Sequence, residues 1–243
     1  MRHRLAIAGL TLGALATLIF GQVVTSADAS KPTIPFDDAR LKIEANATAG
    51  DAGIQFFIDA EEWKHITVTN PQGRKVLDVG AGKVIRNFGL SELFSESSEP
   101  PFTEFPFAEF EKLFPEGVYT FRGQNINGEQ LMSTFTLKHT IPDGAKITSP
   151  TEGSTLPATG VTVAWEPVTT PAGIDIAAYE VIVIADDSGL GTAERTVDVT
   201  TPPTATRMAV PPVFLTPGGY KVEVLAIERG GNQTTVEVAF TVA

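Results

Sequence analysis

Cysteine is missing from this chain of 243 residues. Its absence excludes disulfides, a thiolate nucleophile and thiolate metal ligands, and also a lipid-modified N-terminal cysteine. Small secreted domains often use disulfides to supplement a limited hydrophobic core. This chain is long enough to form a substantial core without them.

Basic residues are scarce. The chain carries 18 lysine and arginine residues against 29 aspartate and glutamate residues, a net charge of −11. Nucleic-acid binding depends mainly on cationic contacts to phosphate, so the composition argues against nucleic acid as a partner. Both halves of the chain share the acidic excess, so neither is a charged tail.

Sequence motifs of enzymes and metal sites are also missing. The chain has no glycine-rich phosphate loop, and no nucleophile turn or zinc-ligand spacing lies near His65 or His139. We therefore expect no catalytic residue, no metal site and no cofactor. Of the two tryptophans, Trp165 is predicted to lie in a core, whereas Trp63, between two charged residues, is a candidate for the surface.

The first 29 residues have the features of a secretory signal peptide. Two arginines precede an apolar run from Leu5 to Phe20, and Ala27-Asp28-Ala29 offers a small-x-small cleavage site. The apolar run is slightly shorter than the roughly 17–25 residues that span a bilayer. We predict cleavage without stable membrane insertion afterwards, an uncleaved anchor being the alternative. The mature chain is then a secreted bacterial protein of the periplasm or the medium.

The second half of the chain, residues 145–243, has the patterning of β-strands. Val161, Val163 and Trp165 alternate with small or polar residues, and the same period of two recurs in "YEVIVIA" and "YKVEVLA". Proline and glycine clusters separate these runs. Such patterning predicts an antiparallel β-sandwich.

Particular segments of this half resemble a fibronectin type III domain: "VAWEPV" as a second strand, "AAYEVIVIAD" as a third and "LTPGGYKVEVLAIERGGN" as a sixth. The resemblance implies that Tyr220 forms a tyrosine corner, in which the hydroxyl bonds to the backbone just upstream. It also implies an interaction or spacer module. The family has no catalytic residues to carry over.

The first half, residues 30–144, ends in the same order as the second. "EGVYTFRG" matches "GGYKVEVL" around Tyr119, and Asn127-Gly128 predicts a type I′ hairpin before the last strand. We interpret this as a weak internal repeat. Tyr119 is then a second tyrosine corner, in a divergent immunoglobulin-like sandwich.

An acidic, phenylalanine-rich insertion, residues 89–117, fits neither pattern. Pro106 and Pro115 predict the two ends of a short helix, with Phe107, Phe110 and Phe114 on one face. The simplest interpretation is a loop whose helix plugs the core. Long connections of unusual composition also bind partners, which makes these residues binding candidates together with Trp63: Glu92, Glu96, Glu99, Phe102, Glu104 and Phe105.

The sequence thus predicts an all-β protein of two tandem antiparallel sandwiches of immunoglobulin-like or fibronectin type III-like type, with one short helix in the first. The expected function is non-catalytic: binding an unidentified envelope or extracellular protein or glycan, or acting as a spacer. One alternative is a hydrolase or metal-dependent enzyme with two carboxylates of the insertion as acid and base. Another is a sugar-binding module in which Trp63 forms an exposed strip with Phe102 or Phe105.

Overall fold

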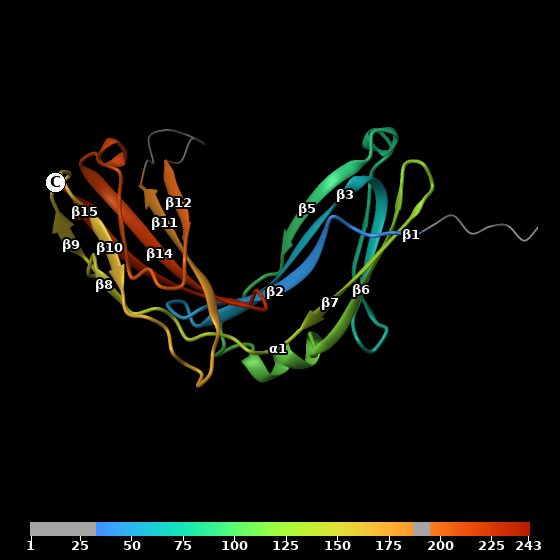
Figure 1. Ribbon diagram of the computed structural model, residues 1–243, viewed down its shortest axis with the longest axis horizontal. Helices are drawn as coiled ribbons and strands as arrows, with labels where there is room; N and C mark the ends of the chain where they lie inside the picture. Colours follow the sequence, from blue (N-terminus) through green and yellow to red (C-terminus); the bar gives the residue numbers. More distant parts are fainter. Residues whose placement is uncertain (1–32, 187–194) are drawn as a thin grey trace, which may run out of the picture. The chain divides into compact units, whose positions relative to one another are not determined.

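The computed structural model describes residues 33–186 and 195–243 (Figure 1), and the predicted signal peptide lies outside them. Strands dominate, and these residues contain one α-helix, α1 (Phe107–Leu113), and two short 3-10 turns. The predicted fold class, all-β sandwiches with one short helix, is confirmed. No helix in the described part of the chain is long and apolar enough to cross a membrane.

The C-terminal half is a sandwich of a three-stranded sheet on a four-stranded antiparallel layer. The smaller sheet has the order β13 (Arg207–Ala209), β10 (Thr162–Trp165), β8 (Ile147–Ser149). The larger layer has the order β12 (Thr196–Thr201), β11 (Ile176–Ala185), β14 (Gly218–Glu228), β15 (Gln233–Val242), and β9 (Ser154–Leu156) pairs in parallel with β15.

Alternate residues of these strands meet in one hydrophobic core. Val163 and Trp165 from the smaller sheet pack against residues such as Val181 and Val222 from the larger layer. The hydroxyl of Tyr220 donates a hydrogen bond of 2.8 Å to the Thr216 carbonyl. That bond is the geometry of a tyrosine corner.

The N-terminal half is built around one long strand, β3 (Asp51–Thr69). The first half of β3 pairs with β2 (Asp38–Asn46) and β5 (Leu90–Glu96). Its second half pairs with β4 (Lys75–Gly80) and β6 (Gly117–Asn125). β7 (Gln130–Leu137) lies next to β6, and the two-residue β1 (Thr33–Ile34) pairs in parallel with β7. A strand that passes from one sheet to the other through a bulge makes a corner of a sandwich.

The predicted helix forms and closes the core of the N-terminal half, the first core. Pro106 caps the N-terminus of α1, and Phe110 is buried between Phe107 and Phe114, with ring centroids 5.6 and 5.0 Å away. Just downstream, the Tyr119 hydroxyl donates to the Pro115 carbonyl at 3.0 Å. The helix therefore plugs the core, as the simplest interpretation of the insertion predicts.

The hairpin between β6 and β7 differs from the prediction. A type I′ turn needs two central residues with positive φ, but Gly128 has φ 77° while Asn127, also described, is not among the residues with positive φ. The amide of Gly128 donates to the Asn125 carbonyl at 3.1 Å. The type I′ prediction is wrong. The loop is instead a type I turn followed by a bulge, which needs positive φ at the glycine alone.

The two cores are joined by paired backbone. β15 pairs in parallel with β2 from Gln233↔Glu44 to Thr235↔Asn46, which makes a 12-stranded sheet. The first core reaches Ile141 and the second begins at Ala145. The described residues nevertheless form one compact unit, so the division into domains at residue 144 stays a prediction.

Candidate functional site

The strongest candidate site is the outer face of β5, β3 and β2, which we call the polar face. These strands lie side by side in Figure 1, and alternate side chains point away from the core. In register across the strands, Arg40 lies opposite Phe57, and Phe57 opposite Phe94. Lys42, Gln55 and Glu96 form the next row. Strand pairing alone therefore brings cations, aromatic rings and carboxylates together.

The first row is a pair of aromatic rings, the exposed Phe94 and the half-buried Phe57, with cations stacked on Phe57. The rings of Phe57 and Phe94 have centroids 5.0 Å apart, and the side chain of Phe94 is 55% exposed. The Arg40 guanidinium carbon and the Lys42 ammonium nitrogen each lie 4.9 Å from the Phe57 centroid. At such distances a cation is attracted by the ring quadrupole.

Hydrogen bonds tie the second row to β15. Gln55 Nε2 donates to Glu96 Oε1 at 2.6 Å. Lys42 Nζ donates to Gln233 Oε1 at 2.7 Å, and Gln233 Nε2 donates to Glu44 Oε2. Gln55 and Gln233 are both buried, so their hydrogen bonds fix the carboxylates of Glu44 and Glu96.

The third part of the polar face is an acidic cluster of Glu44, Glu96 and Glu99, in which one carboxylate oxygen of each lies within 4.8 Å of the others. Glu99 follows β5 and folds over Gly53 of β3. A Cβ atom on residue 53 would lie 2.8 Å from Glu99 Oε1. A side chain at residue 53 would displace Glu99 from this position, so Gly53 permits the cluster.

Electrostatics within the acidic cluster are unfavourable to full ionisation. Burial, followed by the charges of Glu96, Asp51 and Glu44, raises the pKa of Glu99 to about 7. Burial also raises the pKa of Glu44 and lowers that of Lys42. Glu99 Oε1 and Asp51 Oδ1 are buried without a hydrogen-bond partner. The cluster can hold a proton near neutral pH, and its oxygens are of the kind that calcium takes as ligands.

The predicted binding residues separate into two groups. Glu92 and Glu96 lie on the polar face and Glu99 beside it, whereas Glu104 is exposed outside it. Phe102 and Phe105 are partly buried against the first core. A binding role for these residues stays a prediction.

The prediction that Trp63 lies at the surface is wrong. Its side chain is fully buried in the first core. The reason is a bulge: Asp59 pairs with Glu92 but Trp63 pairs with Leu90, and Glu62 between them has φ 29°. Trp63 therefore cannot belong to the exposed aromatic strip of a sugar-binding module.

Several residues of the polar face were not predicted: Arg40, Lys42, Glu44, Phe57, Phe94 and Gln233. The alternation of charged and apolar residues in "RLKIE" could have identified three of them, because every second side chain of a strand shares a face. Gln233 has no such signal, since it reaches Glu44 from 189 positions away.

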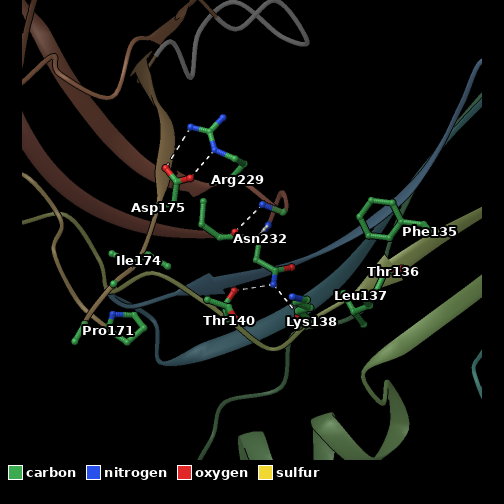
Figure 2. A pocket seen from close by; sticks show the side chains of 14 residues that line it. Phe135, Thr136, Leu137, Lys138, Thr140, Pro171, Ile174, Asp175, Arg229 and Asn232 are labelled. Carbon is green, nitrogen blue, oxygen red and sulfur yellow. Dashed lines mark hydrogen bonds and ion pairs between the residues drawn. The ribbon is translucent and has the colours of Figure 1, made fainter.

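A cavity of about 410 Å³ lies beside the joint between β2 and β15 (Figure 2). In Figure 2, Arg229 and Asp175 pair across one wall at 2.6 Å, and Asn232 holds the backbone of Lys138 and Thr140 at 2.8 Å each. Arg229 and Asp175 thus neutralise each other, and the side chain of Asn232 is occupied in holding the joint.

No protein-family model and no curated protein matches the chain. Among solved structures it is similar to the FN1-FN3 domains of chicken CNTN1, with 12% identity and a TM-score of 0.32, covering 87% of this chain and 65% of that one. It is also similar to a tetra-tandem repeat in the extending region of a large adhesion protein, with 18% identity and a TM-score of 0.29, covering 85% and 50%. The chain spans less than two thirds of either structure. Because these TM-scores are low, the fold assignment rests on the strand pairing above.

Proposed function

We propose that the protein is a non-catalytic binding protein that acts outside the cytoplasm and holds a protein or glycan partner on its polar face. The observation that carries this proposal is the row of Arg40, Phe57 and Phe94. Exposed aromatic and arginine side chains are enriched where binding energy is concentrated. Here they are ordered in advance by strand register, so little conformational entropy is lost when a partner binds.

The charge pattern of the polar face supports selective binding. The cationic groups of Arg40 and Lys42 lie on the aromatic row, between the acidic cluster on one side and the row of Asp38, Asp59 and Glu92 on the other. A partner with the opposite arrangement of charges is oriented by it, and a partner with the wrong arrangement is repelled. Export is supported by the predicted signal peptide.

Capture from an envelope extract tests this function. The chain from residue 30 onward is immobilised as wild type, Phe94→Ser and Arg40→Ala, and the retained proteins and glycans are identified. We expect Phe94→Ser to weaken retention of the partner at least about tenfold, the loss typical of a buried aromatic contact.

Val118→Ser is the matched control. Val118 also lies on a strand, and its exposed fraction of 51% is similar to that of Phe94. It lies outside the polar face. Retention that is equal for wild type, Phe94→Ser and Val118→Ser would refute binding at this face. Thermal unfolding of each variant separates loss of binding from loss of fold.

A hydrolase is the second candidate, favoured by one observation: Glu96 and Glu99 meet, and the pKa of Glu99 is raised to about 7. A general acid needs such a pKa. Four cavities at the surface of the described residues, however, are lined by other side chains. Turnover of chromogenic glycosides by wild type but not by Glu99→Gln would replace our proposal with this one.

A further inference from the structure

The loop between β4 and β5 exposes apolar side chains that no core explains. Val84 is 90% exposed, Phe88 77% and Ile85 41%, and none of the three contributes to either hydrophobic core. Figure 1 draws this loop as a short coil where β5 begins. Three large exposed apolar residues within five positions form a patch of the kind that marks an interaction site.

The same loop carries positive charge on an acidic protein. Lys83 and Arg86 are exposed, and neither forms an ion pair with a described residue. No acidic residue occurs from Val79 to Ser91. At the base of the loop, the backbone and Cβ of Glu62 lie against Gly89. The tip is therefore cationic and apolar together, on a chain of net charge −11.

Three backbone amides of the loop are already hydrogen-bonded within it. The amide of Arg86 donates to the Gly82 carbonyl, and the amides of Phe88 and Gly89 donate to the Ile85 carbonyl, each at 2.9 Å. Unpaired backbone groups are the main obstacle to placing irregular chain in an apolar medium. The hydrogen bonds around this 3-10 turn, Ile85–Asn87, pair some of these groups and so lower the cost of insertion.

We propose that the tip of this loop, residues 83–88, inserts reversibly into the surface of an anionic membrane. Val84, Ile85 and Phe88 enter the boundary between headgroups and acyl chains, while Lys83 and Arg86 remain at the lipid phosphates. This division of apolar and basic side chains is how peripheral segments bind anionic bilayers. The inference is independent of the polar face and goes beyond the proposed binding function.

Vesicle sedimentation tests the proposal. The chain from residue 30 onward is used, because the apolar leader would bind lipid itself, and both hydrophobic cores lie within it. The vesicles are pure phosphatidylcholine or phosphatidylcholine mixed with phosphatidylglycerol. We expect binding to the anionic vesicles, weakened at least about tenfold in Val84→Ser/Phe88→Ser and in Lys83→Glu/Arg86→Glu. Salt at about 0.5 M should weaken it as well, because the phosphate attraction is screened.

Val213→Ser is the matched control, since Val213 is 94% exposed in another loop and should not affect binding. A second measurement reports insertion directly. Trp63 and Trp165 are buried, so Phe88→Trp adds an exposed indole whose emission should shift to the blue with anionic vesicles. Wild type that stays in the supernatant with both vesicle types, or binding lost equally in Val213→Ser, would overturn the proposal and leave the loop as a contact for proteins.

Discussion

At the scale of single residues, Glu99 shows how the surroundings of a strand face can raise the pKa of a carboxyl group. The side chain lies over Gly53 between Glu96, Glu44 and Asp51. Burial is the larger cause of its raised pKa, and the neighbouring carboxylates add to it. The acidic cluster therefore destabilises the fold when it is fully ionised, which is a measurable property.

Glu99→Gln should change how stability depends on pH. The pKa of Glu99 is about 7 in the fold against an ordinary 4.5, so between these values the unfolded chain releases a proton that the folded chain keeps. The free energy of unfolding of the wild type therefore falls as pH rises from 4.5 to 7. Since Glu99 is partly exposed, we expect Glu99→Gln to be more stable than wild type by about 1–2 kcal/mol at pH 8.

Denaturant unfolding at pH 4, 6 and 8 measures this difference, which should disappear at pH 4. Glu104→Gln is the control, because Glu104 is exposed and outside the acidic cluster. A Glu99→Gln variant that is no more stable than wild type at pH 8 would show that Glu99 is not held in the buried position described.

At the scale of elements, the bulge in β3 determines which side chains enter the first core. Residues 60–62 are unpaired with β5 between Asp59 and Trp63, and beyond the bulge the partners of β3 change from β2 and β5 to β4 and β6. Gly89, with φ 80°, lies directly against the bulge: a Cβ atom on it would come within 2.6 Å of the Glu62 backbone. The bulge in β3 therefore depends on a glycine at position 89.

Gly89→Ala should destabilise the first sandwich. The added methyl group meets backbone atoms rather than a movable side chain, and alanine is strained at positive φ. We expect a loss of about 2–3 kcal/mol, measured by thermal unfolding. Gly82→Ala in the same loop is the matched control, because no atom lies within 4 Å of its Cβ position; equal losses in the two variants would contradict the role of the bulge.

At the scale of the whole molecule, Asn232 connects the two cores. Its side chain donates to the carbonyls of Lys138 and Thr140 and accepts from the amide of Ile43, at 2.8, 2.8 and 2.9 Å. Asn232 is buried and immediately precedes the pairing of β15 with β2. A single amide therefore satisfies the backbone of β2 and of the segment that leaves β7.

Asn232→Ala should loosen this joint. It leaves the buried Ile43 amide without its side-chain partner and frees two carbonyls, so we expect a loss of about 2–4 kcal/mol. Limited proteolysis should show faster cleavage within residues 138–144, and calorimetry should show the loss of stability. Asn87→Ala, at an exposed position, is the control. Cleavage as slow as in wild type would show that the β2–β15 ladder alone holds the joint.

The sequence was informative where structure depends on near neighbours. Alternation predicted the strands that carry Val163 and Val222, and two prolines with three phenylalanines predicted α1. The resemblance of the segment around Tyr220 to a fibronectin type III domain, and the matching segment around Tyr119, predicted the two tyrosines whose hydroxyls bond four residues upstream. Each of these features depends on a few consecutive residues, so a local pattern is sufficient to predict it.

The sequence alone therefore determined the all-β class, the short helix and the list of acidic candidates, because periodicity and turn residues act over a few positions. Only the tertiary structure decided that Trp63 turns inward and that Glu99 meets Glu44. It also decided that Gln233 and Asn232 reach strand β2 from about 190 positions away. These outcomes depend on bulges and register, which follow from how distant strands pack and which no local pattern encodes.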